Sequence, residues 1–486
     1  MRTQAIDHMA LLPAYLAAAT AVAALVADLI VARRAVVLAT TAIGTLATAV
    51  AAAWLGFGPD RETFCAADGC SYATTRPGAL VAVTLCALTL AVLGLSAATL
   101  RDREGPPHGE YLFLLASSLT GGVVLAYARD LITIIVALET LTLPLYVLVS
   151  MRRKDIRSAE AAVTFLLASV AASALTLLGA ALLYAVTGQV HLSGLSHALH
   201  GPTAPLTAAA VAMVIAGMVF KVAAVPLHAW APGTYDGAPL PIAAYLSTAS
   251  KLGGIVAITW VLTVGLTPVA AVSGGVLAAV AAVTMTVGNL VALRQTRAVR
   301  LLAWSSIAQA GYLLAPFGGL AVASGRTHAG VEAIAAAVIG FAVLYVVLEI
   351  TAFGAVIGLR GERVDGGELD DYAGAARRSP WLAGALILAL TGLAGLPPGL
   401  AGLFAKVTVF SAVAPRLPWL AVVIAVNAVI GLVYYLRFSL RPLRGTPDAA
   451  PGAPLPAAIA AAACVAAAVV LGFAPQLVLH LAAISQ

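Results

Sequence analysis

Long apolar stretches follow one another along almost the whole chain and are separated by short polar loops. A helix needs about 20 apolar residues to cross the hydrocarbon core of a bilayer. Because the apolar stretches reach about this length, we predict an all-α polytopic membrane protein with about 14 transmembrane helices. The expected spans are 9–31, 35–55, 78–100, 111–127, 130–150, 159–184, 205–227, 240–264, 269–293, 300–318, 331–359, 381–411, 417–437 and 454–480.

Proline interrupts two of these spans. Pro226 lies in the seventh, and Pro397 and Pro398 lie in the twelfth. Proline removes a helix hydrogen bond and frees backbone groups that lipid cannot satisfy, so such breaks are typical of helices that line a cavity. Mid-membrane breaks at corresponding places in two inverted repeats are a recurrent transporter design. The pattern therefore predicts two inverted five-helix repeats with broken helices 7 and 12.

The expected organisation has four parts. An N-terminal three-helix segment (1–110) precedes the first repeat (111–265), the second repeat (266–440) and a C-terminal helix (441–486). Most loop arginines follow odd-numbered spans. Cytoplasmic loops carry an excess of Lys and Arg, so we expect these loops in the cytoplasm and both termini on the outer side.

Composition excludes a soluble protein. Apolar residues make up 62% of the chain, charged residues only 10%, and the mean hydropathy is +1.00. The net charge of +6 lies mainly in short loops between spans. This charge therefore indicates how the protein is oriented in the lipid bilayer, and it does not indicate binding to nucleic acid.

The most informative residues are three lysines inside apolar stretches, Lys221, Lys251 and Lys406. An ionised lysine at mid-membrane costs about 2.5 to 3.5 kcal/mol on insertion scales, so its presence indicates a function. Glu139, central in the fifth span, could form a coupled pair with Lys221. These residues predict a proton relay. The alternatives are a structural ion pair and lysines that extend to the interface.

Two further residues are open to two interpretations. His228 follows Lys221 by two helical turns and either relays protons, as a histidine that titrates near neutrality can, or only forms a hydrogen bond. Glu349, deep in the eleventh span, is either an additional proton site or a protonated hydrogen-bond donor.

Other candidate sites are weaker. Cys65 and Cys70 share a loop expected on the outer side, where they form either a disulfide or two free thiols. His191, His197 and His200 are interpreted as ordinary loop histidines. The sequence contains no phosphate-binding Gly-rich loop, CxxC cluster or haem motif. We therefore expect no cofactor and no metal in this chain.

The block 220–251 resembles the antiporter-like membrane subunits of respiratory complex I. It contains Lys221, Pro226 and His228, then Tyr-Asp-Gly-Ala-Pro over 235–239, and it ends in Ser-Thr-Ala-Ser-Lys. Within that family it is most similar to subunit N of bacterial NADH:quinone oxidoreductase. Other segments agree with the resemblance, namely 288–296, 300–312, 393–406 and 427–437.

The resemblance implies a proton-translocating subunit in a bacterial plasma membrane. Partner subunits would contain NADH, FMN, iron–sulfur clusters and quinone, and the neighbours would be K-type and M-type membrane subunits. The family's proton-relay positions correspond to Glu139, Lys221, His228, Lys251 and Lys406.

The chain departs from the family pattern in three places. Gly233 replaces a common Asp, Gln309 stands where many relatives have His, and Glu349 adds a charge. An Mrp-type cation/proton antiporter subunit is the main alternative, which the Tyr-Asp-Gly-Ala-Pro block disfavours. A membrane scaffold without transport is a third, which the cost of retaining the buried charges disfavours.

Overall fold

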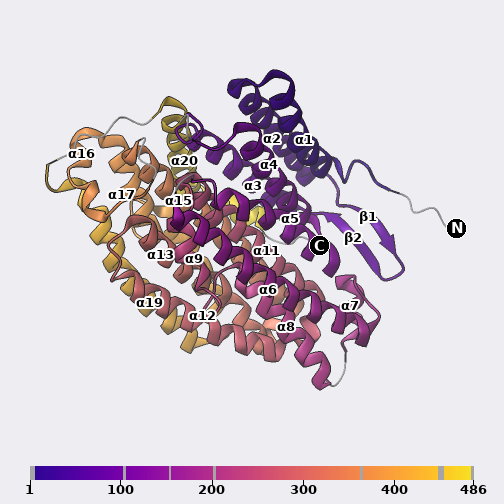
Figure 1. Cartoon of the computed structure of the whole chain (residues 1–486). Coiled ribbons are helices and arrows are strands. Elements are labelled where there is room, and N and C mark those ends of the chain that lie inside the picture. The colour runs from indigo at the N-terminus through magenta and orange to yellow at the C-terminus, as the bar shows by residue number, and fades with distance from the viewer. Residues whose placement is uncertain are drawn as a thin grey trace.

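The computed structural model is a bundle of helices (Figure 1). It describes residues 6–101, 105–152, 155–200, 204–361, 365–446 and 454–482. In this part of the chain, 11 helical segments are long and apolar enough to cross a membrane. They are α1 (Leu12–Val31), α2 (Arg34–Phe57), α3 (Arg76–Leu95), α4 (His108–Tyr127), α5 (Leu131–Val149), α6 (Ile156–Thr187), Leu240–Gly265, Thr267–Ala292, α15 (His328–Arg360), Pro418–Leu443 and α20 (Leu455–Phe473).

The other three expected spans correspond to shorter helices. The seventh contains α8 (Pro205–Lys221), and α9 (Trp230–Gly237) follows after its end. The tenth is α13 (Ala298–Leu314), and the twelfth is α17 (Pro380–Ala394) with α18 (Leu400–Val413). The predicted helical membrane fold is therefore confirmed, and its helix number agrees approximately with the expected 14.

Short elements complete the helical part of the fold. Leu240–Gly265 is built from α10 (Leu240–Tyr245), the π-helix η1 (Leu246–Ser250), α11 (Lys251–Trp260) and the π-helix η2 (Val261–Gly265). The remaining elements are α7 (Leu192–Ala198), η3 (Thr267–Val269), α12 (Ala270–Ala292), η4 (Ala315–Ala321), α14 (Ala323–Arg326), η5 (Leu369–Tyr372), α16 (Ala375–Arg378), α19 (Pro418–Ser439), η6 (Arg441–Leu443) and α21 (Gln476–Ala482).

The seventh span is broken between α8 and α9, as the proline predicts. Side chains form hydrogen bonds with backbone groups on both sides of the break. Trp230 Nε1 donates to the Phe220 carbonyl at 3.3 Å, and the Val225 N–H donates to Thr284 Oγ1 at 3.0 Å. The protein thus supplies the hydrogen bonds that lipid cannot.

The twelfth span is broken between α17 and α18, where glycine is required for two reasons. Gly395 has a φ of +88°, a left-handed conformation that ends α17. A Cβ atom at Gly402 would lie 1.7 Å from the Gly392 carbonyl oxygen, so only glycine lets α18 approach α17 this closely. The break therefore depends on glycine as much as on Pro397 and Pro398.

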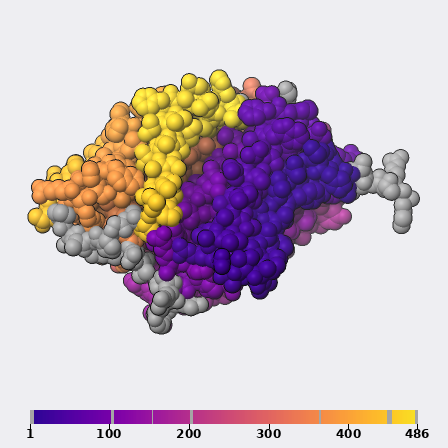
Figure 2. All heavy atoms as spheres, turned by 90° about the horizontal axis from the view of Figure 1, so that it is seen from above, coloured from indigo at the N-terminus to yellow at the C-terminus, as the bar shows by residue number. Residues whose placement is uncertain are grey.

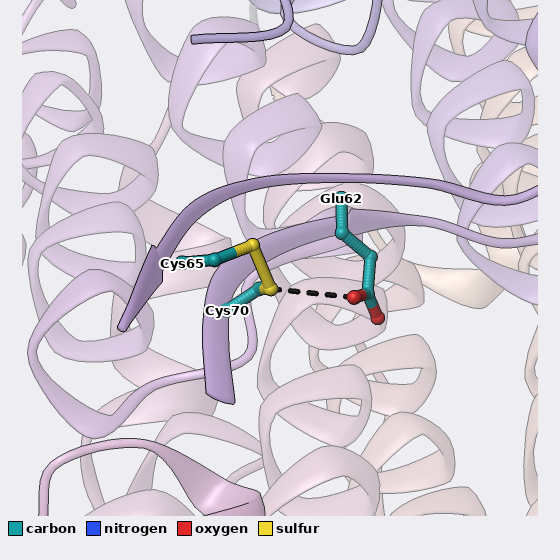
Figure 3. Close-up of side chains that lie close together, drawn as sticks. All are labelled: Glu62, Cys65 and Cys70. Carbon is teal, nitrogen blue, oxygen red and sulfur yellow. Dashed lines mark hydrogen bonds between the residues drawn. A yellow bond between two sulfur atoms is a disulfide. The ribbon is translucent and has the colours of Figure 1, made fainter. Parts of the chain in front are cut away.

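The all-α prediction missed a β-hairpin between α2 and α3. β1 (Arg61–Ala66) pairs antiparallel with β2 (Gly69–Thr74), and Cys65 lies opposite Cys70. The two cysteines form a disulfide, which decides between the two alternatives left open by the sequence (Figure 3). Glu62 Oε2 lies 3.2 Å from Cys70 Sγ. Because both sulfurs are bonded to each other, this group offers no thiolate to a metal.

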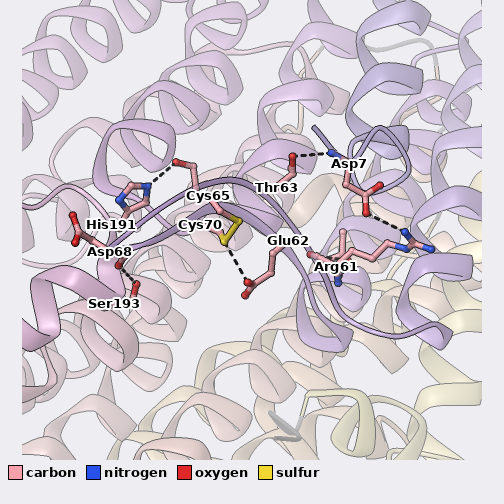
Figure 4. The surroundings of a disulfide bond; sticks show 11 residues. Asp7, Arg61, Glu62, Thr63, Cys65, Asp68, Cys70, His191 and Ser193 are labelled. Carbon is pink, nitrogen blue, oxygen red and sulfur yellow. Dashed lines mark hydrogen bonds and ion pairs between the residues drawn. A yellow bond between two sulfur atoms is a disulfide. The ribbon is translucent and has the colours of Figure 1, made fainter. Parts of the chain in front are cut away.

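The hairpin connects the N-terminal segment to the region around α7 (Figure 4). At one end Arg61 forms an ion pair with Asp7 at 3.0 Å, and its hydrogen bond holds the pKa of Asp7 below its usual value. At the other end Ser193 Oγ donates to the Asp68 carbonyl at 2.8 Å, and His191 Nε2 lies 3.3 Å from Ser71 Oγ. His191 thus has a structural contact, as expected for a loop histidine.

Candidate functional site

Glu139 and Lys221 form an ion pair between α5 and the end of α8. Lys221 Nζ donates to Glu139 Oε1 at 2.8 Å. It also donates to Ser169 Oγ at 2.9 Å and to Thr142 Oγ1 at 3.3 Å, while Ser173 Oγ donates to the same Glu139 oxygen. The Lys221 side chain is 5% exposed and that of Glu139 23% exposed. The expected pair is present, and hydroxyl groups surround it.

The sequence analysis did not identify Thr142, Ser169 and Ser173, the three hydroxyl residues of this cluster, although their spacing along the helices could have indicated them. Thr142 follows Glu139 by three positions on α5, and Ser169 and Ser173 are four apart on α6. Residues three or four apart share one face of a helix. Each helix therefore presents two polar side chains to the end of α8. The sequence could not show that α6 rather than another helix packs there.

Lys251 begins α11, directly after the π-helix η1. Its Nζ donates to both the carbonyl oxygen and Oγ of Ser306 on α13, each at 2.5 Å. Tyr345 of α15 donates to the same Ser306 hydroxyl at 3.0 Å. The lysine is 2% exposed, so it does not extend to an interface. A π-turn in an α-helix is frequent at functional sites.

The end of α8, which carries Lys221, packs closely against α11, which begins at Lys251. Gly254, one turn after Lys251, lies against α8, and a Cβ there would be 3.2 Å from the Lys221 Cβ. The absence of a side chain at Gly254 lets α11 approach the end of α8. The two lysines therefore belong to neighbouring faces of these helices.

Glu349 lies in the middle of α15 and is completely buried. Tyr345, one turn earlier on α15, donates to the Ser306 hydroxyl that Lys251 also contacts. Neither of the carboxyl oxygens of Glu349 has a hydrogen-bond partner among the described residues. A buried polar group without a protein partner requires a bound water, an ion or a catalytic role as explanation. The chain thus has an acidic group available beside its central lysine.

A second polar cluster extends from α13 towards the break in the twelfth span. Ser305 Oγ and the Tyr435 hydroxyl are hydrogen bonded at 2.5 Å. Gln309 Nε2 donates to the Tyr435 hydroxyl at 3.0 Å and to the Leu393 carbonyl at 3.2 Å. Gln309 therefore connects α13 to α17 and to α19, and its side chain has a defined structural position although it cannot titrate.

Lys406 lies on α18 beside the break. Its Nζ donates to the Ala394 carbonyl at 2.6 Å, a group left without a helical partner because α17 ends there. The ammonium group also lies 5.3 Å from the centre of the Tyr312 ring, within cation–π range. A cavity of about 370 Å³, lined by Lys406 and Ser411 among others, opens next to it. No carboxylate in the described chain forms an ion pair with Lys406.

His228 lies outside these clusters. It is half-buried in the segment between α8 and α9, where its Nδ1 donates to the Pro226 carbonyl at 3.2 Å. Its ring contacts Trp304 edge-on, with 5.3 Å between the ring centres. In the described structure it has no hydrogen bond to Lys221 or Lys251. Glu139, Lys221 and Lys251 thus lie on packed faces of α5, α8 and α11, whereas Lys406 and His228 lie outside this group.

Asp236, in the block that carries the family resemblance, has a structural role at one end of the bundle. Arg297, between α12 and α13, donates to both carboxylate oxygens of Asp236 at 3.0 to 3.2 Å. Arg297 also lies 3.6 Å from Asp365. Burial raises the pKa of Asp365, but the hydrogen bond and charge of Arg360 outweigh burial, so the pKa lies below its usual value. This network ties α9 to the loops before α13 and after α15.

The fold and the buried ionisable groups together define a polytopic, antiporter-like membrane subunit. The family of NADH:quinone oxidoreductase/Mrp antiporter transmembrane regions matches residues 128–431. This range contains the five proton-relay positions expected from the sequence.

Relatives give a narrower assignment. The chain is 56% identical to NADH-quinone oxidoreductase subunit N of Salinispora tropica, with 99% of each chain covered. It is 42% identical to subunit N 2 of Streptomyces griseus, covering 99% of this chain and 94% of the relative. The chain therefore belongs to the NADH-quinone oxidoreductase subunit N family.

Solved structures agree with this assignment. A chain of respiratory complex I from Thermus thermophilus matches with a TM-score of 0.79 and 29% identity, covering 97% of this chain and 100% of that one. A chain of the Mrp complex from Dietzia sp. DQ12-45-1b matches with a TM-score of 0.84 at 22% identity, covering 99% and 97%. At that identity the Mrp chain shares the fold alone, which leaves the Mrp alternative less supported than subunit N.

Proposed function

We propose that Glu139, Lys221, Lys251 and Lys406 carry protons across the membrane for an NADH-quinone oxidoreductase. As a subunit of that enzyme, this chain would use the energy of redox reactions that take place elsewhere in the complex. One observation carries the proposal. Three lysines are placed inside the bundle, each at or beside an interruption of a helix, and each is held by polar groups. Packing alone does not require such costly residues.

The residues have different roles in this proposal. Glu139 sets the charge of Lys221 through their 2.8 Å contact. Lys251 receives a proton from the Lys221 side, and Glu349 provides an additional proton site beside it. The polar cluster of Ser305, Tyr435 and Gln309, together with bound water, bridges the interval to the break at which Lys406 lies. Lys406 then exchanges protons with its adjacent cavity.

The energies involved are compatible with this mechanism. Moving one charge across 100 mV costs about 2.3 kcal/mol. Removing one partner of a buried ion pair costs about 3 to 5 kcal/mol. Breaking the pair of Glu139 and Lys221 would therefore change the free energy by enough to move one proton across 100 mV.

His228 has a less direct role. Its half-buried ring beside Trp304 is hydrogen bonded to a backbone carbonyl rather than to a lysine. We propose that it takes part in the relay only through water that connects the break to Lys221. A His228→Gln variant keeps a hydrogen-bond donor but cannot titrate. It should lower proton pumping less than a variant of either lysine.

The test is a strain with Lys221→Ala in which assembly of the complex is verified. Proton pumping and NADH:quinone turnover are measured in its membranes, with Arg444→Gln as a control that removes an exposed positive charge from a loop. We expect pumping and turnover to fall together in Lys221→Ala and to be unchanged in the control. Normal values of both in an assembled Lys221→Ala complex would refute the relay.

The cellular arrangement follows from the same proposal. The chain would lie in a bacterial plasma membrane with both termini on the outer side and with K-type and M-type membrane subunits as neighbours. NADH, FMN, iron–sulfur clusters and quinone would be bound by partner subunits. Within the chain, residues 111–265 and 266–440 would be inverted repeats, since α8 and α18 each place a lysine beside a helix break. Reporter fusions at each terminus test the orientation.

A further inference from the structure

An apolar cavity of about 750 Å³ lies between α2, α3, α15 and α20, and none of Glu139, Lys221, Lys251 and Lys406 lines it. Figure 2 shows the C-terminal segment (yellow) beside the indigo and purple N-terminal helices on this face. Apolar side chains form nearly all of its wall, and many of them are small. The lining includes Ala42, Leu88, Gly94, Ile350, Ile459 and Cys464.

The cavity is basic at one end. Arg34, the first residue of α2, lines it and donates to the Leu100 carbonyl at 3.2 Å. Arg33 precedes it in the chain, and Arg101 follows the residue that Arg34 contacts. Within the described residues none of these three arginines forms an ion pair. Arg34 therefore brings a positive charge to the mouth of the cavity.

Two helices also begin at this mouth. α2 begins at Arg34 and α20 begins at Leu455, and both residues line the cavity. The first N–H groups of a helix lack partners within the helix, and the helix dipole favours negative charge at this end. The arginines and the two helix starts thus independently favour an anionic group at the same place.

The length of the cavity corresponds to one leaflet of a bilayer. It follows α3 from Ala97 back to Thr84 and α20 from Leu455 to Ala467. At 1.5 Å per helical residue these stretches are about 18 to 20 Å long. Half of a typical hydrocarbon core is about 15 Å thick. The cavity therefore runs from the arginine-rich membrane surface to about the middle of the membrane.

We propose that this cavity binds an anionic phospholipid of the leaflet on the arginine-rich side. The phosphate group lies at Arg34 and the starts of α2 and α20, and the acyl chains occupy the apolar wall between α3, α15 and α20. Basic pockets between transmembrane helices are known to take anionic headgroups. An isoprenoid quinone tail or a helix of another subunit would fill the apolar part, but neither provides an anion for the arginines.

Photo-crosslinking in the complete complex tests the proposal. The complex is placed in nanodiscs that contain phosphatidylglycerol with a photoreactive acyl chain, or phosphatidylcholine with the same chain, and labelled peptides are identified by mass spectrometry. We expect phosphatidylglycerol to label 84–97 and 455–467 more strongly. Arg34→Gln should lower this labelling about fivefold, the typical effect of one arginine near an anionic membrane surface.

Arg444→Gln is the control, because this exposed arginine lies in a loop beside α16, where its carbonyl accepts from Gly374, and does not line the cavity. It should retain most of the labelling. Equal labelling by the two lipids would refute the anionic specificity. No labelling by either lipid, as expected if a partner helix or a quinone tail fills the cavity, would refute the site. The comparison of lipids uses the wild-type complex and does not depend on assembly of a variant.

Discussion

Glu139→Gln should slow proton transfer strongly while leaving the fold intact. Glutamine has the same length as glutamate, and its carbonyl oxygen can still accept hydrogen bonds from Lys221 and Ser173. Only the negative charge is lost. Removing one partner of a buried ion pair costs about 3 to 5 kcal/mol, and the 23% exposure of the Glu139 side chain favours the lower value. A step that needs the charged pair would then slow about a hundredfold, since each 1.36 kcal/mol is a factor of ten.

The assay compares this variant with Glu160→Gln, which removes an exposed carboxylate from α6. Both complexes are purified, checked for full subunit content and reconstituted in vesicles with a pH-sensitive dye. We expect Glu160→Gln to pump normally and Glu139→Gln to lose most pumping and quinone reduction. If Glu139→Gln pumps at the wild-type rate, the ion pair is structural and its charge has no part in proton transfer.

Three further outcomes are expected. Lys406→Met should abolish pumping in an assembled complex, whereas Thr408→Val, a partly exposed neighbour on α18, should not; equal pumping of the two would contradict a role for the lysine. Arg297→Lys should destabilise the complex by about 1 to 3 kcal/mol in thermal unfolding, because lysine cannot contact both oxygens of Asp236, and an unchanged unfolding temperature would contradict this. The lowered pKa of Asp365 contributes stability that is present above its unfolded pKa of about 3.9 and is lost as the pH falls through the folded value. Asp365→Asn should therefore lose less stability than the wild type on acidification in thermal unfolding scans, and parallel losses would contradict the assignment.

The helices and the buried position of most charged residues of the candidate site could be predicted from the sequence for a simple physical reason. A spanning helix must be apolar over about 20 residues, so each span is visible locally. A lysine or glutamate inside such a span is costly and therefore conspicuous. The pairing of Lys221 with Glu139 could therefore be predicted from their positions inside apolar spans, although 82 positions separate them in the chain.

Features that depend on tertiary packing were not predictable. Ser169 and Thr142 are common small polar residues of membrane helices, and only the packing of α5, α6 and α8 turns them into ligands of a lysine. The hairpin 61–74 is short, polar and partly exposed, so it gives no apolar signal. The spacing of His228 from Lys221 places both on one face only if the helix is unbroken. Because α8 ends at Lys221, the position of His228 depends instead on the path of the chain after α8.

The two helix breaks hold their lysines by different means, and this difference bears on mechanism. Lys221 faces a carboxylate, so loss of its proton would leave Glu139 without a counter-charge in the bundle. Lys406 faces a carbonyl freed by the end of α17, an aromatic ring and a cavity, all of them neutral. In the proposed relay, a change in charge would therefore act through Glu139, whereas Lys406 would exchange a proton without leaving a buried carboxylate unpaired. We expect the Glu139 end to act as the switch and the Lys406 end as the point of exchange.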